Sequence, residues 1–140
     1  MYVVDASVWV SRFMDTDLYH VFSRAWLGAR LASGEWVVAP AVALAEVAGA
    51  VARRTGQPQL GKSAATLLQT APNARLVSIG PELAEQGAVA AADLRLRGAD
   101  ALYVALAQRL GVPLVTWDQE QQERGQRVIT VLTPQETIQR

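Results

Sequence analysis

The sequence predicts an α/β fold, a three-layer α/β/α sandwich with a five-stranded parallel sheet at its centre. Short runs of β-branched and apolar residues alternate along the chain with longer helical segments, as strand–helix–strand units do in parallel sheets. Such units are right-handed almost without exception, which places helices on both faces of the sheet. The 140 residues contain no linker or repeat, so we expect a single domain over 1–140.

The first half of the chain predicts two strands and four helices. An apolar strand over 2–4 ends at Asp5, and Ser7 is placed to cap the helix that follows. Gly34 stops the second helix, and Pro40 closes the second strand. The expected ranges are helices over 8–14, 18–32, 41–53 and 60–68, and a second strand over 36–38.

The second half continues the alternation with three strands. Pro81 stands where a first-turn proline opens a helix, and Gly98 and Gly111 bound the next one. The expected ranges are strands over 75–79, 113–116 and 127–132, and helices over 81–97, 99–110, 119–124 and 134–139.

Composition excludes several classes of protein. Thirteen basic residues balance 13 acidic ones, so net charge gives no case for general nucleic-acid binding. With 51% hydrophobic residues and no cysteine, disorder, disulfides and Cys-ligated zinc are excluded. No apolar run reaches the roughly 20 residues of a membrane span, and no basic leader precedes the apolar start. We therefore expect a cytoplasmic protein with no membrane association.

Four acidic residues occupy unusual positions. Asp5 and Asp118 follow the first and fourth strands, where each suits either a helix cap or a ligand site at the carboxyl edge of the sheet. Glu46 is the single charged residue within 41–52 and lies either on a narrow exposed stripe or in a site. Asp100 begins an apolar helix, where the helix dipole also favours a carboxylate.

The four acids predict a site for a hard divalent cation if they converge. Carboxylates packed together repel one another, and some stay protonated unless a cation balances them. An all-oxygen set without His or Cys suits Mg²⁺ or Mn²⁺. The single histidine, His20, is expected to be exposed rather than functional.

The chain resembles PIN-domain proteins. The resemblance rests on Val4-Asp5-Ala6-Ser7-Val8, on Glu46, on the stretch Gly98-Ala99-Asp100-Ala101-Leu102-Tyr103 and on Leu114-Val115-Thr116-Trp117-Asp118. More narrowly, the chain is similar to the ribonuclease toxins of VapBC-type toxin–antitoxin pairs, over essentially its whole length. This implies the strand order 3-2-1-4-5, with Asp5, Glu46, Asp100 and Asp118 as catalytic metal ligands and Ser7 and Thr116 as supporting residues.

The resemblance also implies an activity and partners. The activity is Mg²⁺-dependent (or Mn²⁺-dependent) hydrolysis of RNA that leaves a 5′-phosphate and a 3′-hydroxyl; the partners are a cognate antitoxin and a second copy in a homodimer. Guanidinium groups suit phosphate, and the candidates are Arg12, Arg53 and Arg95, with Arg54 and Arg97 beside them. Trp9, Phe13, Trp26 and Trp36 are either interface anchors or core residues.

Two other functions compete with this interpretation. A phosphoaspartyl enzyme, such as a haloacid-dehalogenase-type phosphatase, also carries an Asp after the first strand. It needs a second Asp two residues later, where this chain has Ser7, and a lysine near the late strands, whereas Lys62 lies in a middle helix. A catalytically silent module that keeps the fold to bind a partner is the other alternative.

Overall fold

The computed structural model describes residues 1–138 and contains five strands and eight helices in that range. The strands are β1 (Tyr2–Val4), β2 (Val37–Pro40), β3 (Ala74–Val77), β4 (Leu114–Val115) and β5 (Val131–Leu132). The helices are α1 (Ala6–Phe13), α2 (His20–Ser33), α3 (Ala43–Thr55), α4 (Pro58–Thr70), α5 (Pro81–Leu94), α6 (Gly98–Leu110), α7 (Gln119–Gly125) and α8 (Pro134–Ile138). The predicted end of the last helix, Gln139, lies outside the described residues.

The sheet is parallel throughout and has the order β3-β2-β1-β4-β5, which confirms the expected topology. Central β1 fixes the register, because Val3 pairs with Val38 on one side and with Leu114 on the other. The chain adds β2 and β3 on one side of β1, and then crosses over to add β4 and β5 on the other side. A crevice opens at the carboxyl ends of the strands where the order of addition switches sides in this way, here between β1 and β4.

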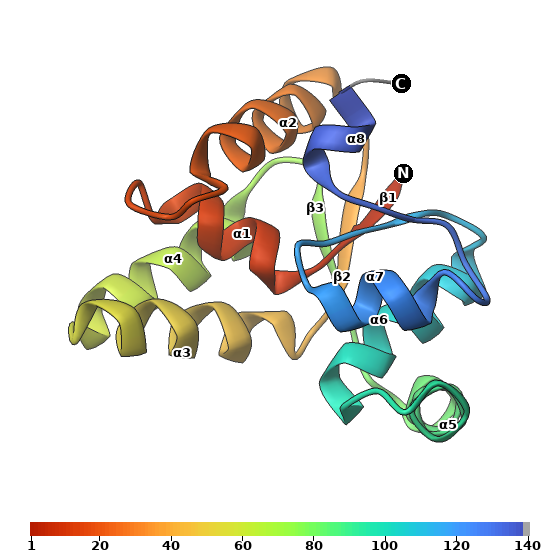
Figure 1. The fold of residues 1–140 in the computed structure, drawn as a ribbon. Helices are drawn as coiled ribbons and strands as arrows, with labels where there is room; N and C mark the ends of the chain where they lie inside the picture. The colour runs from red at the N-terminus through yellow and green to blue at the C-terminus, as the bar shows by residue number, and fades with distance from the viewer. Residues whose placement is uncertain (139–140) are drawn as a thin grey trace.

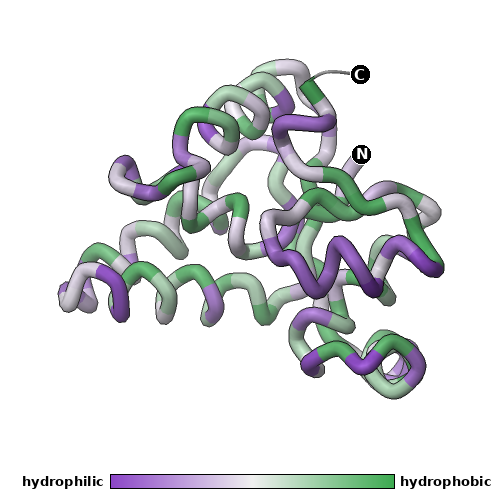
Figure 2. Tube along the Cα trace, viewed as in Figure 1, coloured by the Kyte–Doolittle hydropathy of each residue, from purple (hydrophilic) through white to green (hydrophobic). Residues whose placement is uncertain are grey.

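Helices cover both faces of the sheet, as predicted. In Figure 1 α1, α2, α3 and α4 lie on one side of the strands, and α5, α6 and α7 lie on the other. Helix α6 packs directly against β1, β2 and β4, which explains why its sequence is almost entirely apolar. Figure 2 shows the contrast with α7, whose residues are mostly hydrophilic.

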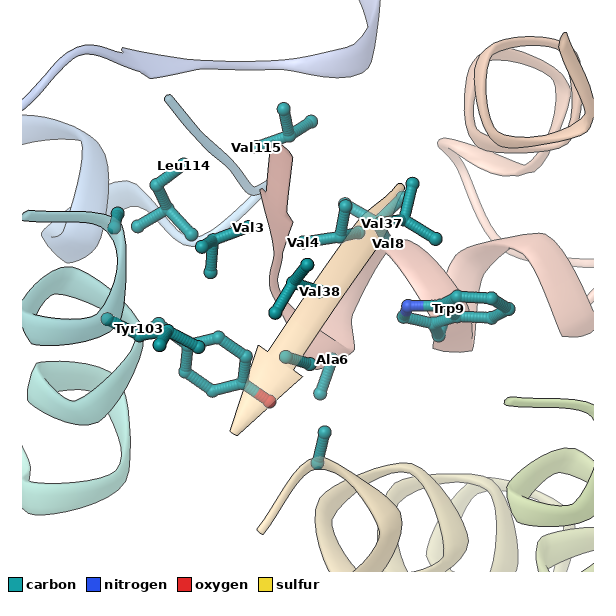
Figure 3. Packing of buried hydrophobic residues seen from close by; sticks show 14 of the residues in the cluster. Val3, Val4, Ala6, Val8, Trp9, Val37, Val38, Tyr103, Leu114 and Val115 are labelled. Atoms are coloured by element: carbon teal, nitrogen blue, oxygen red, sulfur yellow. The ribbon is translucent and has the colours of Figure 1, made fainter. Parts of the chain in front are cut away.

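The core consists of valines from the sheet and larger side chains from the helices. Val3, Val4 and Val8 are fully buried, and Figure 3 shows Val3 on the side of β1 that faces Tyr103, with Val4 and Val8 on the opposite side. Burial of each such side chain stabilises the fold by about 1.5–3 kcal/mol. Trp9 and Trp26 also belong to this core, so neither is exposed as an interface anchor. No helix within residues 1–138 has the length and apolarity to cross a bilayer.

The first helix begins earlier than expected and has a different cap. Asp5 is extended (φ −68°, ψ 154°), and its Oδ2 accepts the Ser7 backbone N–H at 2.9 Å, so α1 starts at Ala6 and Ser7 lies inside it. The prediction of a Ser7 cap was therefore wrong. Asp5 occupies the cap because β1 ends at Val4.

All three strands of the second half are shorter than predicted, and so is α5. Helix α5 ends at Leu94, because Arg95 takes the left-handed conformation (φ 56°). The last strand is only β5, since the N–H groups of Val128 and Ile129 donate to the Gly125 carbonyl and hold the preceding residues in a turn.

Candidate active site

The four predicted acids line one cleft of about 640 Å³. Asp5 and Asp118 come from the residues that follow β1 and β4, Glu46 from α3 and Asp100 from the first turn of α6. Figure 1 shows α1, α3, α6 and α7 meeting near the carboxyl ends of β1 and β2. The fold thus brings four distant segments to the edge of the sheet where ligands bind in α/β proteins.

Asp5 is the most buried of the four acids, with 5% of its surface exposed. One oxygen caps α1, and the other accepts a hydrogen bond from Gln121 Nε2 at 3.1 Å. Burial raises the pKa of Asp5, and the Ser7 and Gln121 hydrogen bonds oppose that rise. The cap and the site are therefore compatible roles, because each carboxylate oxygen has a second lone pair.

Glu46 is half-buried and receives a hydrogen bond from Tyr103. The Tyr103 hydroxyl donates to Glu46 Oε1 at 2.7 Å, and in Figure 3 that hydroxyl points away from the apolar cluster, past Ala6. Desolvation raises the pKa of Glu46, the Tyr103 hydrogen bond lowers it, and the charges of Asp5 and Asp100 raise it again. Glu46 thus belongs to the acidic cluster rather than to a separate solvent-facing stripe.

Asp100 also has a raised pKa. Desolvation, followed by the charges of Asp118 and Asp5, raises its pKa from 3.8 to about 6, while Arg97 opposes the shift. Asp118 caps α7 through Oδ1, which accepts the Gln121 backbone N–H at 2.8 Å. Mutual repulsion between these carboxylates is the property that a bound cation would relieve.

Ser7 and Thr116 belong to a hydrogen-bond chain that ends on Asp5. The Thr116 hydroxyl donates to Gln121 Oε1 at 2.6 Å. The contact of 3.4 Å between Ser7 and Thr116 therefore uses the Ser7 proton, and Ser7 Oγ accepts the Trp117 backbone N–H at 3.1 Å. This chain fixes the Gln121 amide so that its N–H₂ group faces Asp5.

Sequence reasoning missed Gln121 and Tyr103. Gln121 is fully buried and connects Thr116 with Asp5, but in the sequence it resembles the other glutamines of a polar helix. Tyr103 was detectable, because it is the one hydroxyl-bearing residue in its apolar helix and lies three residues after Asp100, on the same face.

The arginines divide into those at the cleft and those away from it. Arg53 and Arg54 line the cleft, whereas Arg12 and Arg95 are not among its lining residues. Arg97 precedes α6 and acts on Asp100 through its charge.

His20 is also outside the cleft lining, as expected, but its predicted exposure was wrong. The side chain is half-buried, and Nδ1 makes a hydrogen bond of 2.9 Å with the Ser11 carbonyl.

The donor set fits a hard divalent cation such as Mg²⁺ or Mn²⁺. All four groups are carboxylates; burial raises the pKa values of Asp5, Glu46 and Asp100, and the charges of neighbouring acids add to the rise. Within residues 1–138 no group of three or more acidic or histidine side chains is close enough together to hold a metal ion. Mg²⁺ does not require one, because it usually binds through one or two carboxylates and keeps several waters.

Solved structures share this fold at low sequence identity. VapC20 of Mycobacterium tuberculosis, described as a sarcin–ricin loop cleaving toxin, is 21% identical, with a TM-score of 0.67 over 85% of this chain and 91% of its own. VapBC2 of Rickettsia felis, solved with a promoter DNA fragment, is 10% identical, with a TM-score of 0.71 over 94% and 97%. FitAcB of Neisseria gonorrhoeae is 17% identical, with a TM-score of 0.68 over 96% and 99%.

The sequence itself also matches a family. No curated protein matches the chain, but the model of the PIN domain matches residues 2–126. That range contains the whole parallel sheet except β5, and all four acids of the cleft. The strand order, the acidic edge of the sheet and the sequence match agree: the chain belongs to the PIN domain family.

Proposed function

We propose that this protein is a divalent-cation-dependent endoribonuclease and the toxin of a toxin–antitoxin pair. The observation that carries the proposal is the convergence of Asp5, Glu46, Asp100 and Asp118 in one cleft of a PIN-family chain. Structures of similar fold include a toxin described as cleaving the sarcin–ricin loop and the VapBC2 and FitAcB proteins. An antitoxin and a second copy of the chain are proposed as its partners.

The four acids act together in the proposed chemistry. Asp5 and Asp100, together with Asp118 and Glu46, would hold the cation. When bound, Mg²⁺ would supply an activated water and would stabilise the charge that develops on a phosphodiester. Gln121 orients Asp5, and Tyr103 orients Glu46, through the hydrogen bonds they donate. Arg53 supplies positive charge for the phosphate at the same cleft.

The phosphoaspartyl alternative has no support in the geometry. Lys62 lies exposed on α4 and does not line the cleft, and position 7 is a serine whose Oγ already contacts Thr116 and the Trp117 N–H. The lysine and the second aspartate of that chemistry are therefore both missing from the cleft.

The direct test is cleavage of total RNA by the wild type, by Asp5→Ala and by Asp100→Asn, in Mg²⁺ and in EDTA. We expect 5′-phosphorylated fragments from the wild type in Mg²⁺ only, and a loss of at least about 100-fold in both variants, in line with the removal of a group that stabilises transition-state charge. Asp93→Asn, which changes an exposed acid of α5, is the matched control. Equal cleavage by all four proteins would exclude these acids from the mechanism, and binding of RNA without cleavage would favour the silent module.

A further inference from the structure

Two aromatic rings form a stack at the rim of the acidic cleft. Tyr19 and Trp117 lie nearly parallel, with ring centroids 4.0 Å apart and an interplanar angle of 8°. Both residues line the cleft that contains the acids, and Trp117 immediately precedes Asp118. Tyr19 retains 38% of its surface exposed, so the stack is accessible from the solvent side of the cleft.

Trp117 is held from both its backbone and its ring. Its backbone N–H donates to Ser7 Oγ at 3.1 Å, and its indole Nε1 donates to Ser23 Oγ at 2.7 Å. The buried Ser23 and Ser11 hydroxyls are 2.6 Å apart, and the Ser11 hydroxyl donates a hydrogen bond to the Val8 carbonyl at 3.1 Å. The ring plane is therefore fixed before any ligand arrives, which lowers the entropy cost of binding.

Tyr19 is anchored through the loop that carries it. Its backbone N–H donates to Asp17 Oδ1 at 2.8 Å, and Asp17 Oδ2 accepts a hydrogen bond from Arg54 at 2.5 Å. Only 11% of the Asp17 side chain is exposed. Arg54 is thus a positioning residue, which ties the loop before α2 to α3.

Arg53 lines the same cleft and has a different role. It is exposed and takes part in none of the salt bridges found among residues 1–138. Its guanidinium lies over Gly49, where an added Cβ would be 3.0 Å from Nη1. Because Gly49 has no side chain, there is room for the Arg53 guanidinium beside it, and this positive charge is available to a ligand in the cleft.

We propose that the Tyr19–Trp117 stack binds an unpaired RNA base next to the acids, with Arg53 on the adjoining phosphate. This inference rests on the proposed nuclease function and deepens it. An aromatic platform next to a free guanidinium matches a nucleotide, which has a flat base and an anionic linkage. Bases inside a duplex are covered on both faces, so the occupant is single-stranded or looped RNA.

The test is binding of a fluorescein-labelled single-stranded RNA, measured by anisotropy in Mg²⁺ in the Asp100→Asn background, so that cleavage is not required. Tyr19→Ala removes the ring on which the base would stack and should weaken RNA binding about 10-fold. Tyr19→Leu keeps an apolar side chain but no ring, and should weaken binding equally. Tyr19→Phe should retain the affinity. Trp36→Ala, which removes an aromatic residue of similar exposure (40%) outside the cleft, should leave it unchanged.

Two further ligands separate base stacking from charge. A strand of the same length with abasic sites should bind weakly, and equally to the parent and to Tyr19→Ala, whereas Arg53→Gln should weaken both strands. Unchanged RNA affinity in Tyr19→Ala, or an equal loss on the abasic strand, would overturn the proposal and leave the platform to a peptide partner. Base-dependent binding without any cleavage by the wild type would instead refute the nuclease and leave the platform standing.

Discussion

Replacement of Asp100 by asparagine should stabilise the cation-free protein at neutral pH. The raised pKa of Asp100 means that the folded state disfavours its charged form. The side chain therefore costs nothing below its ordinary pKa of 3.8; the free energy of unfolding of the wild type falls as the pH rises from 3.8 to about 6 and levels off above that. Asparagine is nearly isosteric and carries no charge, so it removes this dependence.

The magnitude follows from the size of the shift and the exposure of the group. A change in pKa from 3.8 to about 6 corresponds to a ceiling of about 3 kcal/mol at neutral pH. Asp100 is only half-buried, and water screens its repulsion from Asp5 and Asp118. Loss of the favourable carboxylate–dipole interaction at the start of α6 removes a few tenths of a kcal/mol more. We therefore expect a net gain of about 1 kcal/mol, equivalent to roughly 2–4 °C in Tm for a chain of this size.

The assay is urea unfolding followed by tryptophan fluorescence in EDTA, at several values between pH 4.5 and 7.5. The difference between Asp100→Asn and the wild type should be small at the acidic end and largest above pH 7. Addition of Mg²⁺ at pH 7 should raise the stability of the wild type more than that of the variant. A difference that is independent of pH, or an Asp93→Asn control that behaves in the same way, would refute the assignment of the shift to the acidic cluster.

Three other substitutions test single contacts. Gln121→Leu should lower the free energy of unfolding by about 2 kcal/mol, because it leaves buried polar partners unsatisfied, while exposed Gln119→Leu should change it little. Tyr103→Phe removes the hydrogen bond that lowers the pKa of Glu46. The pKa of Glu46 should therefore rise, and the acidic limb of the pH profile of RNA cleavage should move to higher pH. Gly61→Ala places a Cβ 2.3 Å from a backbone carbonyl of α3, and denaturant unfolding should show a loss of about 1–3 kcal/mol.

Controls for these substitutions come from the same chain. Gly28→Ala meets nothing within 4 Å in the middle of α2, so it should stabilise the protein by about 0.5–1 kcal/mol. A loss there as large as at Gly61 would contradict the close-approach argument. Tyr2→Phe changes a tyrosine outside the cleft. If the pH profile of RNA cleavage moves equally in Tyr2→Phe and in Tyr103→Phe, the shift does not arise from Glu46. Wild-type stability in Gln121→Leu would remove Gln121 from the chain that holds Asp5.

The sequence by itself determined the fold class and the four acids of the cleft. Strand–helix alternation is a local signal, because apolar runs and Gly or Pro boundaries act over a few residues. Asp5, Glu46, Asp100 and Asp118 were detectable because a carboxylate in an apolar setting is costly and therefore rare. Parallel strands then place groups at their carboxyl ends on one edge of a sheet without further information.

Only the tertiary structure decided how those acids are supported and what surrounds them. Gln121 is indistinguishable in sequence from exposed Gln119, and its burial arises from contacts with Thr116 and Asp5 across the fold. The Tyr19–Trp117 stack joins residues nearly a hundred positions apart. Periodicity and propensity describe neighbours along the chain, whereas hydrogen bonds and stacking between distant segments exist only once the sheet has set their distance.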